Sequence, residues 1–368
     1  RAEAIARVVL ATRIDRWDHY RSLVDPDQIR LELMLYLGDN DDALRLLNRK
    51  HGYQSRFQAS LGFLFRDFDK GRLAELPDQL KHQAALHYLS DAPFDLLPID
   101  EACSLLEGHE TPSSLTALLG SIYFLRGEET SLRRVIEELR TIAQKEAEHD
   151  EAGARKTLAD ARSFEACLEF EKGELEAAIG AFEESVKIEK GPSRKKKFCP
   201  RGVGGILFPL ALCLRGGPKD LQRAQQLGKW CTELDETVSS CYGSFGQSIA
   251  DCLAGQGREI LRNAEYRHRD FLTSEPPNFN SLLFAIMLRL AGAEPDYVES
   301  WGERMAEMAV QAADAGYAWL AMEAAAFCAD VAPSKDNDKR LETFTAALGI
   351  EGASPFSSQL TPPKPWEA

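Results

Sequence analysis

The sequence has no hydrophobic run long enough to cross a membrane. Its longest apolar stretch, residues 206–214, is closed off by Arg201 and Arg215, far short of the ~20 residues that a membrane-spanning helix needs. Charges interrupt every turn of residues 1–15, which argues against a secretory signal peptide. We therefore expect a soluble protein with no membrane partner. The chain begins with Arg1 rather than Met, so we also expect it to be part of a longer protein.

Acidic residues outnumber basic ones. The chain has 44 Lys and Arg against 58 Asp and Glu, a net charge of −14. A surface that cradles nucleic acid along its whole length is normally basic, so that class is disfavoured, although a local basic patch is still allowed. Aromatic residues make up only 9% of the chain, and no alternating β-branched run predicts a strand.

Paired metal-ligand motifs are also missing. None of the eight cysteines forms a C-x-x-C pair, and His82 and His87 lie five residues apart, on different faces of a helix. Most cysteines lie in apolar helical stretches, where a free thiol behaves as a small buried hydrophobe. We therefore expect reduced thiols, a cytoplasmic location, and no metal or other cofactor.

Helical stretches that end at Gly, each followed by a second helix, are the most regular feature present. Gly is favoured just past a helix C-terminus because it adopts a left-handed backbone without a clash. The partner helices carry apolar residues at steps of three and four. Such a pair cannot bury its apolar stripe alone, so neighbouring pairs must stack on it. The four stretches are residues 31–38, 116–127, 162–173 and 205–217.

These patterns predict an all-α fold, an α-solenoid of stacked helical hairpins. We expect one array over residues 1–190, a second over 191–350 that continues the same solenoid, and a Pro-rich linker over 351–368. The clearest hairpin pairs 152–172 with 175–188, and later helices are expected at 203–215, 219–234, 238–254, 257–273, 279–292, 295–314, 317–331 and 336–348.

Two units resemble the tetratricopeptide repeat. Leu119, Gly120, Tyr123 and Gly127 match the spacing of that repeat's first helix, and Gly173, Ala178, Phe182 and Ser185 match its second. No unit carries both halves, because Leu132 replaces the Ala of the first and Glu169 the Tyr of the second. The chain thus looks like a degenerate, tetratricopeptide-like array.

Residues 190–220 stand apart from this acidic background. A basic cluster is followed directly by a Gly-rich helix entry; its members are Arg194, Lys195, Lys196, Lys197, Arg201, Gly202, Gly204 and Gly205. Cations beside the N–H groups of a helix start suit an anion such as phosphate, so contact with nucleic acid or an acidic partner is one interpretation. The other is a solvated loop whose glycines allow close helix packing. The nucleotide-binding spacing G-x-x-x-x-G-K-[ST] is not present.

The same segment resembles the helical region ahead of the motor in large bacterial Swi/Snf-type DEAD/DEAH-box ATPases. The matching residues are Lys197, Phe198, Pro200, Gly202, Gly205, Phe208, Pro209, Leu210, Ala211, Leu212, Gly217, Pro218, Leu221 and Ala224. This resemblance covers about thirty residues. It implies a non-motor portion of a DNA-translocating protein, whose phosphate-binding loop and helicase motifs would lie elsewhere.

Three functions remain open at this level. The first is a non-catalytic scaffold whose partner is an adjoining ATPase motor or another protein, with DNA as a candidate ligand of the basic segment. The second is a separate tetratricopeptide-like domain that binds peptides or proteins. The third, an enzyme, is disfavoured because no nucleophile–base pair or metal cluster converges in the sequence.

Overall fold

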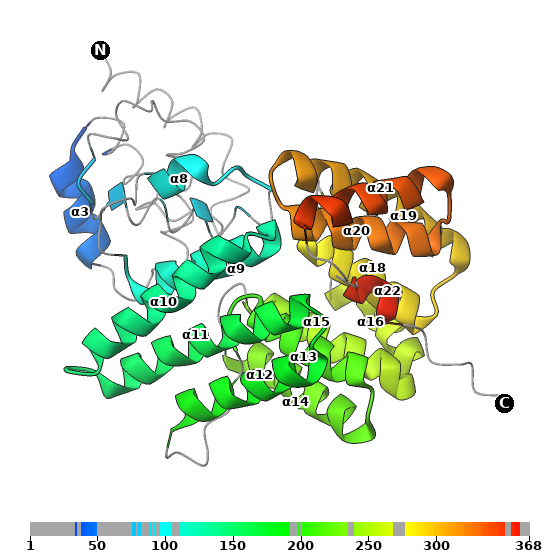
Figure 1. Ribbon diagram of the computed structural model, residues 1–368, viewed down its shortest axis with the longest axis horizontal. Helices are drawn as coiled ribbons and strands as arrows, with labels where there is room; N and C mark the ends of the chain where they lie inside the picture. The colour runs from blue at the N-terminus through cyan, green and yellow to red at the C-terminus, as the bar shows by residue number, and fades with distance from the viewer. Residues whose placement is uncertain are drawn as a thin grey trace, which may run out of the picture. The chain divides into compact units, whose positions relative to one another are not determined.

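The computed structural model describes two compact units, and helices are the only regular elements in its described residues (Figure 1). The described stretches are 38–49, 96–104, 111–191, 200–234, 239–267, 277–349 and 355–360, with isolated positions at 34, 76–92 and 198. The predicted all-α class is therefore confirmed for this part of the chain.

The first unit comprises residues 1–92 and 99–111. Its described helices are α3 (Asn40–Arg49) and the short α8 (Asp100–Ser104). Asp41 and Asp42 lie in the first turn of α3, where carboxylates complement the helix dipole.

The second unit comprises residues 93–98 and 112–368. Neighbouring helices along the chain pack against one another, as the hairpin pattern predicts. The helices are α9 (Ser113–Arg126), α10 (Glu129–Glu146), α11 (Glu151–Glu171), α12 (Leu175–Lys190), α13 (Gly204–Arg215), α14 (Pro218–Leu234), α15 (Ser239–Asp251), the π-helical η2 (Cys252–Gln256), α16 (Gly257–Arg267), α18 (Phe279–Ala291), α19 (Pro295–Asp314), α20 (Ala318–Val331), α21 (Lys335–Leu348) and α22 (Phe356–Gln359).

Glycine turns close the hairpins where the sequence places them. Gly127 has φ +69° and its N–H donates to the Phe124 carbonyl at 2.9 Å, which ends α9 and lets α10 fold back. Gly173 has φ +78° and does the same between α11 and α12, with its N–H 3.0 Å from the Phe170 carbonyl. Both glycines belong to the repeat-like spacing read from the sequence.

The late helix α20 returns to pack against α9, the first long helix of this unit. The ring centroids of Phe124 on α9 and Trp319 on α20 lie 4.6 Å apart, and both side chains are buried. In an open solenoid each repeat contacts only its neighbours, so this contact differs from a simple linear array. It arises because Trp319 fills a space that α9 and α18 share, with Phe279 of α18 at 6.0 Å.

The predicted linker over 351–368 is wrong for residues 355–360. These form α22 and its flanks, with Phe356 1% and Leu360 3% exposed, and α22 packs on α20. The expected boundary at residue 190 falls between α12 and α13, which lie in the same unit and contact each other. In the described part of the chain, no helix has both the length and the apolarity needed to span a bilayer.

Candidate interaction surface around the basic segment

Besides Gly205, the structure describes three of the eight residues that make up the basic cluster and its helix entry. Arg201, Gly202 and Gly204 lie at the entry of α13, whereas Arg194 and Lys195–Lys197 fall outside the described residues, as does Cys199. The contacts of Arg201, Gly202 and Gly204 show how the chain is held next to the basic cluster.

Arg201 forms an ion pair with a buried carboxylate of α11. Its Nη2 lies 2.5 Å from Asp160 Oδ2 and also donates to the Lys156 carbonyl at 3.2 Å. Burial raises the pKa of Asp160 to about 6, although Arg201 and then Lys156 act in the opposite direction. A buried charge needs such a partner, so Arg201 has a structural role that its sequence context does not reveal.

Gly202 and Gly204 allow a close approach between the entry of α13 and two serines. A Cβ on Gly202 would clash with Ser121 Oγ on α9, and one on Gly204 would clash with Ser163 Oγ on α11. Gly202 also has φ +56°, in the left-handed region that favours glycine. The packing interpretation that the sequence left open therefore accounts for both glycines.

The two ends that flank residues 192–197 both lie close to one short stretch of α11. On one side Gly191 ends α12, and a Cβ there would lie 3.0 Å from Arg155 Nε. On the other side Arg201 contacts Lys156 and Asp160. More cations accompany these anchors: Lys156 is exposed, and the last turn of α12 carries Lys187 and Lys190.

The α13 part of the motif that carries the resemblance to Swi/Snf-type ATPases lies in the core of the second unit. Phe208, Leu210 and Ala211 of α13 are each 0% exposed, and Phe208 stacks on Phe182 of α12 with ring centroids 5.1 Å apart. A Cβ on Gly246 of α15 would lie 3.0 Å from Pro209, so α15 approaches α13 closely there. These side chains serve packing and present no chemistry to solvent.

The expectation of reduced thiols throughout is wrong at Cys231. This residue of α14 is disulfide-bonded, whereas Cys103, Cys167, Cys213, Cys252 and Cys328 form no disulfide. Burial raises the pKa of the Cys213 and Cys252 thiols to about 12, which keeps them protonated and unreactive.

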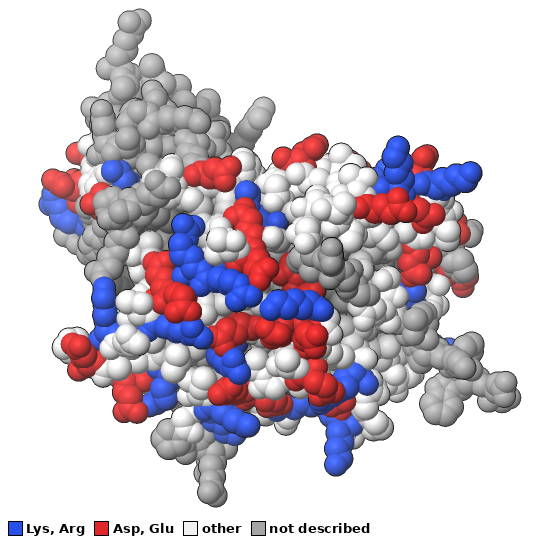
Figure 2. Space-filling view, viewed as in Figure 1, with Lys and Arg blue, Asp and Glu red and all other residues white. Residues whose placement is uncertain are grey.

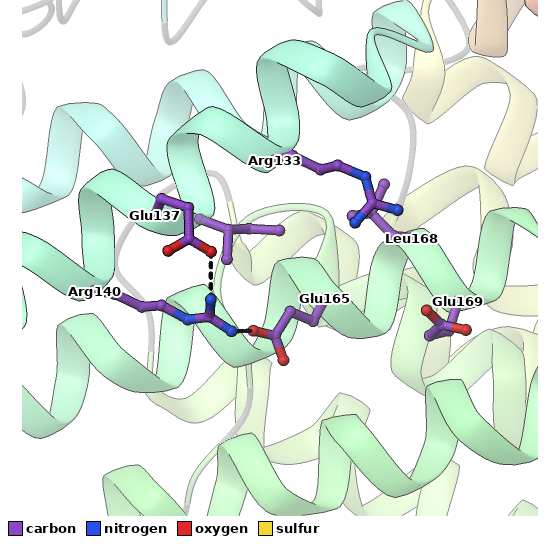
Figure 3. Close-up of a pocket in the computed structure, with 7 residues that line it drawn as sticks. Arg133, Glu137, Arg140, Glu165, Leu168 and Glu169 are labelled. Atoms are coloured by element: carbon purple, nitrogen blue, oxygen red, sulfur yellow. Dashed lines mark hydrogen bonds and ion pairs between the residues drawn. The ribbon is translucent and has the colours of Figure 1, made fainter.

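A second polar feature is a pocket of about 420 Å³ between α10 and α11 (Figure 3). Arg140 reaches across from α10 to pair with both Glu137 and Glu165, as the dashed lines in Figure 3 mark. Arg162 extends the network from Glu165 to Glu184 on α12. Figure 2 shows the result, a face over α10–α12 where cationic and anionic side chains alternate.

This pocket is lined by an ion-paired surface. Its lining residues are Arg133, Ile136, Glu137, Arg140, Glu165, Leu168 and Glu169, with no Ser, Cys, Lys or His nucleophile among them. Arg133 pairs with Glu129 at 2.5 Å and Glu169 with Lys172 at 3.3 Å. Exposed pairs of this kind contribute little stability each, and they give the surface charge of both signs. Over the described residues, no three His, Cys, Asp or Glu side chains gather as a metal site would require.

Sequence reasoning missed two residues with a defined role, Asp160 and Glu323. Both are acidic residues within helical stretches and are buried in the folded unit, and both have a pKa raised by burial. The only available signal for Glu323 is its place in the apolar run 318–329, which contains no other charge. Comparison with protein-family models, curated proteins and solved structures gives no match.

Proposed function

We propose that this chain is a non-catalytic helical scaffold whose basic segment, residues 194–201, contacts the phosphate backbone of nucleic acid. The observation that supports this function best is the position of the segment in the chain. Gly191 ends α12 and Arg201 is ion-paired with Asp160 of α11, so the four consecutive cations Arg194–Lys197 are joined at both ends to ordered helices. A segment tethered at both ends has less conformational freedom to lose on binding than a free terminus.

Electrostatics favours phosphate over an acidic protein as the ligand of this segment. Lys and Arg that neutralise phosphates release condensed counterions, which is a driving force that a folded acidic surface offers much less strongly. The cations of α11 and α12 next to the segment, Lys156, Lys187 and Lys190, would add to the local field. The chain as a whole carries a net charge of −14, which disfavours nucleic-acid contact away from such a cationic cluster.

The resemblance of residues 197–224 extends the proposal to the parent protein. On that basis the chain is a tetratricopeptide-like helical stack within a larger bacterial Swi/Snf-type ATPase, located in the cytoplasm, that holds the motor or duplex DNA in register. ATP hydrolysis would then be carried out by a motor domain outside this chain. The helical stack itself would act by holding its partners in place.

A second candidate is a domain that binds peptides or proteins. One specific observation favours it: a short segment, residues 355–360, packs on α20 and is held there by both apolar and polar contacts. The two functions are compatible, because that contact involves none of the candidate residues of the basic segment.

Charge reversal tests the proposed contact. Lys195→Glu, Lys196→Glu and Lys197→Glu together should weaken binding to a fluorescently labelled duplex by at least tenfold, measured by anisotropy. The matched control reverses three exposed lysines elsewhere, Lys229, Lys335 and Lys339, and changes the net charge equally. Equal loss in both triple variants would show a general charge effect and refute the assignment to this segment.

A further inference from the structure

The segment 355–360 is held by the second unit in a way that its own sequence does not explain. Its helix α22 has four residues, Phe356–Gln359, far fewer than the roughly 12–15 that an isolated helix needs for stability in water. Its conformation must therefore be imposed by the surface on which it lies. A short segment that is ordered only by its contacts resembles a peptide that folds when it binds.

Apolar contacts anchor the two ends of this segment. The Phe356 ring stacks on Trp319 of α20 with centroids 5.9 Å apart and lies 6.3 Å from Phe170 of α11. Leu360 is 3% exposed, whereas Gln359 between these anchors faces solvent. Burial of a Phe and a Leu provides about 2–3 kcal/mol each before the cost of ordering the segment.

Polar contacts fix the orientation of the segment. The two carboxylate oxygens of Glu323 accept the backbone N–H groups of Phe356 and Ser357, each at 3.1 Å. The Ser357 hydroxyl donates to the Glu323 carbonyl at 3.0 Å, and Arg289 of α18 donates to the Ser357 carbonyl at 3.4 Å. Arg289 is itself positioned by an ion pair with Asp330.

Glu323 is the residue that distinguishes this contact from ordinary core packing. It is 2% exposed within an apolar helix, where an ionisable group is costly unless its charge is satisfied. The partners in the described structure are the two N–H groups of the docked segment, so the carboxylate is a specific receptor for backbone of this orientation.

We propose that α18, α20 and Phe170 form a peptide-binding groove, and that the chain's own segment 355–360 occupies it as an intramolecular ligand. The groove recognises the pattern Pro-Phe-Ser-x-x-Leu. This pattern combines an aromatic anchor, a small hydroxyl residue whose backbone N–H donates to Glu323, and an apolar residue four positions after the aromatic. This inference is independent of the nucleic-acid role proposed above, since it involves neither α11 near Asp160 nor the basic segment.

A cleavable chain tests the proposal with the protein folded beforehand. A protease site inserted between Gly349 and Pro355 allows the segment to be cut and removed from the folded protein. A labelled peptide of residues 353–362 should then bind the cut protein and show no binding to the uncut one.

Two changes should weaken this binding by about tenfold or more. Ser357→Pro in the peptide removes the N–H that Glu323 accepts, and Glu323→Gln in the protein removes the charge and turns one oxygen into a donor. If the cut protein does not stay folded, the full-length Phe356→Ala variant replaces it, since loss of the anchor should open the groove to the native peptide in trans. Absence of binding to either protein, or equal binding of the Ser357→Pro peptide, would overturn the proposal.

Discussion

Replacing Arg201 with methionine removes the cation that faces Asp160 while keeping much of the apolar stem. The consequence depends on the ionisation of Asp160, whose pKa in the folded protein is about 6 against 3.8 for the ordinary group. Folding therefore favours the protonated form. The stability that Asp160 contributes is present below pH 4 and is lost as the pH rises through 6.

Removal of Arg201 raises the pKa of Asp160 further, because this cation now lowers it. At pH 5 the carboxyl is protonated with or without Arg201, so the variant should lose less than about 1 kcal/mol of unfolding free energy, mainly from lost hydrogen bonds. At pH 8 the native protein keeps a paired carboxylate, whereas the variant must either hold an unpaired one or take up a proton. Removing one partner of a fully buried pair costs about 3–5 kcal/mol, and the 32% exposure of the Arg201 side chain reduces our expectation to about 2–3 kcal/mol.

Urea unfolding at the two pH values measures this difference. Arg201→Met should destabilise the protein several times more at pH 8 than at pH 5, and Asp160→Asn added to it should restore most of the loss. The control, Arg133→Met, breaks an exposed pair with Glu129 and should cost less than about 1 kcal/mol at either pH. An Arg201→Met penalty that does not change with pH would refute the assigned role of Asp160.

Two further predictions concern packing and buried charge. Gly204→Ala should lower the unfolding free energy by about 1–3 kcal/mol, because the added Cβ would clash with Ser163. The control, Gly180→Ala, places its Cβ in open space on α12 and should raise the unfolding free energy by up to about 1 kcal/mol. Equal thermal midpoints for the two variants would contradict the close approach at Gly204. Burial raises the pKa of Glu323 to about 7 from 4.5, so ionising it in the folded protein costs on the order of 3 kcal/mol, and stability should fall as the pH rises from 5 to 8. Glu323→Gln should flatten that decline, and an unchanged slope in urea titrations would count against the burial of this carboxyl.

The helices of the second unit were largely predictable from the sequence. The ranges expected between 203 and 348 agree with α13–α21 within a few residues in most cases, because Gly and Pro mark the ends and the apolar period marks the faces. The expected end of the helix that begins at 257 lies outside the described residues, which stop at Arg267 in α16. Local signals fix such elements, since each helix depends mainly on its own turn residues.

Long-range partners were not predictable. Nothing in the sequence near Pro355 indicates that the backbone N–H groups of Phe356 and Ser357 bind Glu323, which lies more than thirty residues earlier. A segment rich in Ser and Pro also has no helical period to detect. Likewise Asp160 lies in a charged helical stretch that reads as solvated, and only the fold brings Arg201 to it. The contact of α9 with α20 joins two helices that lie far apart in the sequence, and no pattern in either helix predicts it.

The salt dependence of duplex binding tests the central claim most directly. The logarithm of the association constant falls linearly with the logarithm of the salt concentration, with a slope of about −0.9 for each phosphate neutralised. If the basic segment carries the contact, the variant with Lys195, Lys196 and Lys197 changed to Glu should show a slope shallower by about 2–3 than the unmodified chain. An identical slope in the two proteins, or no binding by the unmodified chain at low salt, would contradict the account.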